Sequence, residues 1–396
     1  MSLRLAIACS ALVLASAALT SCGSSTSKTA ATSTAPTYAP AYVARGPHQV
    51  GVTTLTMAGA TPRKVEVYYP ALTTALKGVA PDVFKMSGLV PANLRAAMNL
   101  PPDQDAPLLT NTYRDVTGDR AAGPFPVVAF SHGLGGYPTE YQQILGHIAS
   151  WGFVVVAPDH FERGLTSLLS DKIVQVDEKA IVLGAVATAR AASAATTGPL
   201  AGVLQPTGKI VVAGHSAGTV SAYDTASNPS VAGMILISGG GMFKDSAAPV
   251  APKPTVPALF LQGETDEVVP PAISRQSFDA LTGPREWAEF KGAGHLSFTD
   301  ICTIGRDKGG IIEIARRAGL LKLLPPGSDT KLAELGTDGC LPKWIKAEET
   351  WPGTDHLLVA FIRWTLHLDS TPKMLDPGLS SRLGPATITI EQQGVK

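Results

Sequence analysis

The chain has 396 residues, 45% of them hydrophobic, and its 32 lysines and arginines balance its 32 aspartates and glutamates. This length suits one large catalytic domain with insertions, and the lack of basic runs or of basic residues interleaved with aromatics argues against a nucleic-acid partner. The sequence shows no zinc-type Cys/His spacing and no phosphate-binding glycine and lysine motif, so neither a metal nor an organic cofactor is implied.

The N-terminal segment predicts export. A short positive start precedes an apolar stretch at 5–19, which is typical of a secretory signal peptide and too short for a membrane span. The segment ends in Leu-Thr-Ser-Cys, which resembles the bacterial lipobox. We therefore expect residues 1–21 to be a lipoprotein signal peptide and Cys22 to be lipidated, with plain secretion as the alternative. Residues 22–44, rich in Ser, Thr, Ala and Pro, predict a flexible tether that leaves the protein on the outer side of a bacterial cell membrane or envelope.

The catalytic domain is expected at residues 45–370. Strands near 49–57 and 64–69 precede an insertion at 71–122, which either covers a pocket or pads the core. The remaining chain alternates between apolar runs and helical patterns, which predicts an α/β protein with a doubly wound, mostly parallel sheet and helices on both faces. The further strands are expected at 126–130, 153–157, 209–213, 232–237, 256–261 and 286–291, and the helices at 140–150, 178–195, 273–281, 311–324 and 355–368.

The C-terminal residues 371–396 are predicted to be a tail. The stretch 386–391 alternates in the manner of a strand and is a candidate edge strand.

The pentapeptide Gly-His-Ser-Ala-Gly at 214–218 lies between an apolar strand and a helix-compatible stretch at 219–226. Small residues two before and two after the serine allow a sharp turn, which lifts the hydroxyl above the sheet edge in front of the helix N-terminus. The pattern predicts Ser216 as a nucleophile, with Gly214 and Gly218 as the glycines of the elbow. The alternative is a glycine-rich turn in a nucleotide-binding or structural α/β unit.

A glycine-rich loop, Ser-His-Gly-Leu-Gly-Gly at 131–136, follows an earlier apolar strand. The tetrahedral intermediate of acyl transfer carries a negative oxygen, which needs two backbone N–H groups already pointing at it. One is expected from Ala217, directly after the nucleophile, and the other from Leu134 in the glycine loop.

The acid and the base are expected further along the chain. Asp266 follows the strand at 256–261, and His295 lies on a glycine-rich loop after the strand at 286–291. In the predicted roles, His295 takes the proton of Ser216 and later passes it to the leaving group, while Asp266 fixes the tautomer and stabilises the imidazolium. Of the other histidines, His160 at the end of a strand is the candidate for lining the pocket.

Four short segments resemble the platelet-activating-factor acetylhydrolase group, which is related to dienelactone hydrolases and cutinase-like polyesterases. The resemblance extends over roughly residues 61–367 and implies an α/β-hydrolase fold and a calcium-independent serine esterase or lipase. The chain order serine, acid, histidine is the one expected of α/β-hydrolases. The matching segments are 131–135, 148–160, 214–218 and 294–300.

The position of the acid distinguishes these relatives. In the eukaryotic acetylhydrolases the acid follows the strand directly after the elbow, where this chain has no carboxylate before Asp245. Asp266 follows the next strand, the position that dienelactone hydrolases use, and is therefore the predicted acid.

Two cysteines remain after export and lipidation. Cys302 and Cys340 are an even pair in an oxidising compartment, which predicts a disulfide that closes the insertion at 297–352; two buried thiols are the alternative.

The sequence thus predicts a serine hydrolase of carboxylic esters, with a lipid or lipid-like substrate and no cofactor. The alternatives are a polyester- or cutin-type hydrolase, an acyltransferase with the same acyl-enzyme, and a surface lipoprotein that only binds a ligand.

Overall fold

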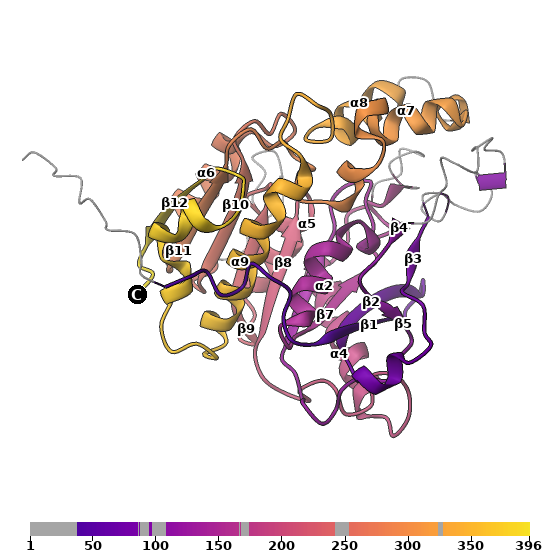
Figure 1. The fold of residues 1–396 in the computed structure, drawn as a ribbon, viewed down its shortest axis with the longest axis vertical. Helices are drawn as coiled ribbons and strands as arrows, with labels where there is room; N and C mark the ends of the chain where they lie inside the picture. Colours follow the sequence, from indigo (N-terminus) through magenta and orange to yellow (C-terminus); the bar gives the residue numbers. More distant parts are fainter. Residues whose placement is uncertain are drawn as a thin grey trace, which may run out of the picture. The chain divides into compact units, whose positions relative to one another are not determined.

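A ten-stranded sheet crosses the described part of the computed structural model, in the order β12-β11-β10-β9-β8-β6-β7-β2-β1-β5 (Figure 1). Cys22 and the predicted signal peptide lie outside the described residues. The structure describes residues 38–85, 87, 95–96, 108–165, 167, 174–241, 253–323 and 328–396.

The middle of the sheet is parallel and is flanked by antiparallel pairs, with the short edge strand β5 parallel to β1. Strands β6 to β11 run parallel to their neighbours, while β1 pairs antiparallel with β2, β2 with β7, and β12 with β11. The strands are β1 (Gln49–Met57), β2 (Arg63–Ala71), β5 (Tyr113–Arg114), β6 (Val127–Ser131), β7 (Val154–Pro158), β8 (Ile210–His215), β9 (Val231–Ile237), β10 (Ala258–Gly263), β11 (Arg285–Phe290) and β12 (Ile388–Gln393), and a separate pair joins β3 (Val83–Phe84) to β4 (Leu108–Leu109).

Helices cover both faces of this sheet because successive strand residues point to opposite sides. Val128 and Phe130 of β6 pack into one core with α2 (Gln142–Ser150) and α9 (Ala347–Thr365). Val127 and Ala129 of the same strand pack into the other core with α4 (Glu178–Ala194), α5 (Gly218–Ala226) and α6 (Pro271–Ala280). The predicted doubly wound arrangement is therefore present.

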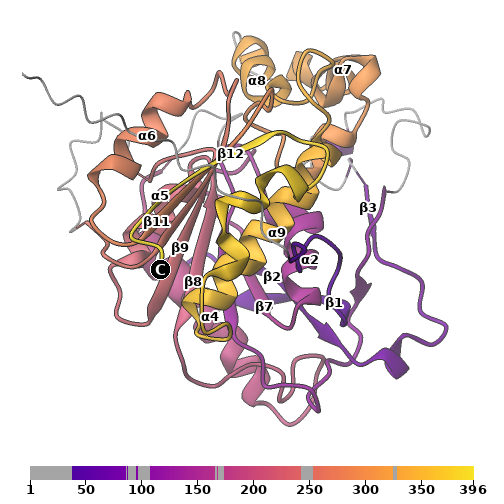
Figure 2. The ribbon, with the colours of Figure 1, turned by 60° about the vertical axis from the view of Figure 1, so that its left-hand side comes forward.

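The insertion after β11 forms a helical layer beyond the strand ends (Figure 2). It contains η4 (Asp300–Thr303), η5 (Arg306–Lys308), α7 (Gly310–Arg317), η6 (Leu320–Leu323) and α8 (Ser328–Thr337). The predicted disulfide between Cys302 and Cys340 is present, with the two Cα atoms 4.3 Å apart. No helix in the described ranges is long and apolar enough to cross a bilayer.

Two predicted boundaries are wrong. The predicted tether extends to residue 44, but Tyr42 is buried, its hydroxyl donates to Asp369 Oδ2 at 2.6 Å, and its N–H donates to His356 Nδ1 at 3.1 Å. A tyrosine ring gains from burial when its hydroxyl finds a partner, and this docks residues 38–44 on the domain.

The other wrong boundary is the C-terminal tail. Leu375, Leu379 and Leu383 are buried, and β12 extends the sheet beside β11, as the candidate edge strand suggested. Residues 371–396 are therefore part of the domain, in which η7 (Lys373–Leu375) and η8 (Pro377–Arg382) connect α9 to β12.

Candidate active site

Ser216 lies at the turn between β8 and α5, with a backbone φ of 54°. A non-glycine residue in this left-handed region is strained, as expected for a nucleophile elbow. A Cβ at Gly214 would lie 2.0 Å from the carbonyl oxygen of Gly218, and a Cβ at Gly218 would lie 2.0 Å from that of Ser131. Both glycines are therefore required by the close approach of β8, α5 and β6 at the turn.

Asp266 and His295 form a buried hydrogen-bonded pair. His295 Nδ1 lies 2.9 Å from Asp266 Oδ2 and 3.1 Å from Oδ1. The carboxylate also accepts the N–H groups of Val268 and Val269, at 3.0 and 2.7 Å, and the side-chain amide of Gln262, at 3.2 Å. These contacts fix the carboxylate and occupy Nδ1, so Nε2 is the ring nitrogen left to serve Ser216.

The two predicted oxyanion donors have no competing acceptor. Within the described residues, neither the Leu134 N–H nor the Ala217 N–H donates a hydrogen bond to a protein group. The next residue of the glycine loop is different, because the Gly135 N–H donates to the carbonyl of Arg163 at 2.8 Å. Leu134 and Ala217 line the same cavity as Ser216 and are available to an oxyanion.

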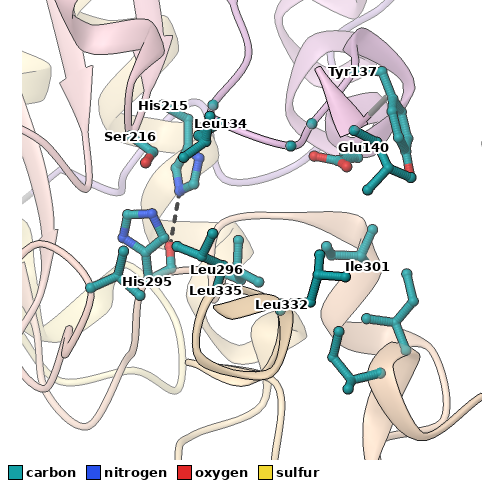
Figure 3. A pocket seen from close by; sticks show the side chains of 18 of the residues that line it. Leu134, Tyr137, Glu140, His215, Ser216, His295, Leu296, Ile301, Leu332 and Leu335 are labelled. Atoms are coloured by element: carbon teal, nitrogen blue, oxygen red, sulfur yellow. Dashed lines mark hydrogen bonds between the residues drawn. The ribbon is translucent and has the colours of Figure 1, made fainter. Parts of the chain in front are cut away.

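His215, next to the nucleophile, connects the elbow to the histidine loop. Its Nε2 donates to the backbone carbonyl of His295 at 2.9 Å (Figure 3), so its Nδ1 accepts from the Tyr141 hydroxyl at 3.0 Å. Burial and the neighbouring His295 lower the pKa of His215 to about 3, which keeps it neutral. Sequence reasoning did not predict this linking role, for which the place of His215 in the motif was the only signal.

Asp338, from the insertion, joins the loop that carries Asp266 (the acid loop) to the loop that carries His295 (the base loop). Its Oδ1 accepts the backbone N–H of His295 at 3.0 Å, and its Oδ2 accepts those of Glu267 and Val268 at 2.7 and 3.1 Å. Asp338 is 2% exposed and lies two residues before Cys340 of the disulfide. Sequence reasoning missed this residue, for which the nearby cysteine was the available signal.

His160 does not line the cavity. Its ring is buried, lies 3.0 Å from Ser131 Oγ and beside Glu178, and its backbone N–H donates to His132 Nε2 at 2.8 Å. Burial lowers the pKa of His160 to about 3. The candidate role of His160 in lining the pocket is therefore not met, because its polar contacts hold it against His132, Ser131 and Glu178.

The cavity beside Ser216 has a volume of about 430 Å³, which is in the range of small-molecule sites. Most of its apolar wall comes from the insertion at 297–352, and none of the described residues of the 71–122 insertion lines it. In the described ranges, no group of His, Cys, Asp and Glu side chains is arranged to hold a metal ion. The aliphatic wall residues are Leu165, Val268, Val269, Leu296, Ile301, Ile311, Ile312, Ile314, Leu320, Leu321, Leu332 and Leu335.

Comparisons with known proteins identify the fold. The chlorophyllase family model matches residues 82–235, a segment that contains the glycine loop and Ser216 but ends before Asp266 and His295. The structure is similar to that of a ferulic acid esterase from Streptomyces cinnamoneus, with a TM-score of 0.58 and 23% identity over 88% of this chain and 98% of that chain. No curated protein sequence matches the chain. The chain has the α/β-hydrolase fold, as its sequence predicted.

Proposed function

We propose that the protein hydrolyses carboxylic esters through an acyl-enzyme on Ser216. The observation that carries the proposal is the buried Asp266–His295 pair, whose histidine lines the same cavity as a strained serine directly after β8. The partial match to the chlorophyllase family model and the fold shared with an esterase support the same reaction class.

The proposed steps follow from the contacts. His295 Nε2 removes the Ser216 proton as Oγ attacks the ester carbonyl, and Asp266 stabilises the imidazolium that results. The N–H groups of Leu134 and Ala217 bind the oxyanion. His295 then protonates the leaving alcohol, and a water activated by the same histidine releases the acid.

The aliphatic wall of the cavity favours a lipid or lipid-like ester, in agreement with the resemblance to platelet-activating-factor acetylhydrolases. A wall built from α7, η6 and α8 over the site suits a single chain better than a polymer surface, which favours a lipase or esterase over a polyester-type hydrolase. Rates on a panel of esters with graded acyl length, measured alongside an insoluble polyester, test this preference.

The direct test of the reaction class is Ser216→Ala. We expect ester hydrolysis to fall by about 10⁴-fold or more, because a triad nucleophile is lost, while the melting temperature stays near that of the wild type. Ser227→Ala, an exposed serine at the other end of α5, is the matched control and keeps its activity. Near-normal turnover by Ser216→Ala would reject the proposal, and a wild type that binds esters without turning them over would favour a ligand-binding lipoprotein.

We further propose that a lipid on Cys22 anchors the enzyme to the membrane; the lipobox-like sequence supports this. Cys22→Ser is expected to move the protein from the detergent-extracted membrane fraction to the soluble fraction with its activity retained. Continued membrane association of this variant would contradict the lipid anchor.

A further inference from the structure

Among the described residues that line the cavity, only one carries a carboxyl group. Glu140, on η3 (Pro138–Tyr141), is 6% exposed and lines this cavity. Figure 3 shows Ser216 and His295 on one side of the pocket, with Glu140 and Tyr137 on the opposite side. The proposed mechanism does not use Glu140.

Burial keeps this carboxyl neutral. Removal from water raises the pKa of Glu140 to about 8, in spite of hydrogen bonds from Tyr137 and with a further rise from the nearby Asp300. The protonated form therefore predominates at neutral pH. A neutral carboxyl in an apolar wall favours a neutral polar partner over a cation.

Tyr137 provides donors for the acceptor atoms of the Glu140 carboxyl, but it does not account for the O–H donor of the protonated form. Tyr137 directly precedes η3, and its backbone N–H and hydroxyl act on the Glu140 carboxyl as donors that lower its pKa, against the larger effect of burial. Both contacts use the carboxyl as an acceptor. A protonated carboxyl also carries an O–H donor, which needs an acceptor when it is buried.

The position of the Glu140 carboxyl in the cavity indicates that a bound substrate can supply the acceptor for its O–H group. A Cβ on Gly136 would lie 2.8 Å from Glu140 Oε2, so the carboxyl packs against the glycine loop that carries Leu134. Aliphatic side chains such as Leu332 and Leu335 supply the wall between the two ends of the cavity. A ligand with its reactive carbonyl at Ser216 thus extends along an apolar surface before it reaches Glu140.

We propose that Glu140 binds a hydroxyl group at the far end of the substrate chain, so that the enzyme selects esters of hydroxylated chains over plain alkyl chains. This inference rests on the proposed ester hydrolysis and names its substrate class. A plain chain of the same length would leave the Glu140 donor buried and unpaired, which is the origin of discrimination in sites built for a substrate hydroxyl.

The experiment compares matched pairs of esters that differ only in a terminal hydroxyl, across several chain lengths. One arm places the hydroxyl on the acyl chain and the other on the alcohol. For the wild type we expect kcat/KM to favour the hydroxylated member by about tenfold in one arm, at the chain length that spans the cavity, mostly through a lower KM.

Two variants then assign the preference to Glu140. Glu140→Leu is expected to abolish it, and Glu140→Gln, which still donates a hydrogen bond, to keep most of it. If Glu140→Leu fails to fold, the wild-type panel still tests whether hydroxylated chains are preferred, and the KM values of Glu140→Gln test whether Glu140 is the origin of that preference. No preference in either arm, a preference that survives Glu140→Leu, or a stronger preference for a terminal ammonium would overturn the inference.

The outcomes separate the two proposals. Hydrolysis of both members of each pair at equal kcat/KM rejects the hydroxyl site but leaves the esterase intact. If the wild type hydrolyses no ester, the proposed function fails and the inference falls with it.

Discussion

The ends of the parallel strands and the insertion at 297–352 contribute different things to one cavity. Strands β8, β10 and β11 lead into short loops that carry Ser216, Asp266 and His295; all three are buried, and Asp266 and His295 are hydrogen-bonded to each other. The insertion contributes mainly aliphatic side chains from α7, η6 and α8. For the proposed function, we therefore expect the reaction to depend on the sheet edge, and the fit of an apolar chain to depend mainly on the insertion.

Asp338 is an exception to this division between the sheet edge and the insertion. It belongs to the insertion, yet it accepts backbone N–H groups from both the acid loop and the base loop. Changes to the insertion are therefore expected to act on substrate choice when they alter the wall, and on rate when they disturb Asp338.

The largest effect is expected from a change at the sheet edge. Asp266→Asn removes the charge that orients and stabilises the histidine, so kcat should fall by about 10⁴-fold, equally for esters of every chain length. The melting temperature should change little. Asp245→Asn, outside the described residues, is the matched control and should retain activity. If Asp245 proved essential and Asp266 dispensable, the assignment of the acid would be wrong.

The disulfide tests the insertion as a unit. Replacing both Cys302 and Cys340 with serine opens a loop with a sequence separation of 38, for which the chain-entropy estimate is about 4 kcal/mol of unfolding free energy. Thermal unfolding with and without reductant measures the loss, and chain-length selectivity should broaden as the wall loosens. Two free thiols in exported protein, detected by mass spectrometry of unreduced peptides, would contradict the bridge.

Asp338→Asn should reduce activity less than Asp266→Asn does, because it disturbs the two catalytic loops without removing a member of the triad. An amide has only one acceptor oxygen, so its NH₂ group must face an N–H group of one of the two loops. We expect kcat to fall by about 10- to 100-fold with KM nearly unchanged, because the triad is misaligned while the wall stays intact. Asp307→Asn, an exposed aspartate in the same insertion, is the control. A change confined to KM would place Asp338 in substrate binding instead.

The smallest effect is expected on stability, from a buried carboxyl group in the sheet away from the cavity. Burial raises the pKa of Glu286 on β11 from 4.5 to about 8. Between these values the unfolded chain ionises while the folded chain keeps its proton, so this group lowers stability as the pH rises from about 4.5 to about 8.

Glu286→Gln removes that penalty. The variant should melt about 2 °C higher than the wild type at pH 8 and show little difference at pH 4, with the Gln392 hydrogen-bond partner retained. A gain of the same size at both pH values would show that ionisation is not its cause.

The same contrast explains what could be predicted from the sequence. The parallel strands were placed within two residues of their observed bounds, because their apolar runs are buried on both faces. The pairing of Asp266 with His295 followed from the chain order and the strand ends. Short-range patterns therefore predicted the fold and the proposed catalytic residues.

The rest depends on contacts between distant segments. The sequence does not show that Asp338 reaches the His295 loop, or that Glu140 lies in an apolar wall built from helices far along the chain. For the same reason, the contacts that bury Tyr42 and the leucines of η7 and η8 were not predicted, and these segments were assigned to a tether and a tail.

The central claim is that Ser216 is a nucleophile activated by His295 and Asp266. The most direct test treats the wild type with a fluorophosphonate probe and maps the modified residue by mass spectrometry of peptides, with Ser216→Ala and Asp266→Asn in parallel. The account predicts one adduct per chain on Ser216 in the wild type, no adduct on the alanine variant and much slower labelling of the asparagine variant. Absence of labelling in folded wild-type protein, or an adduct on another serine, would contradict it.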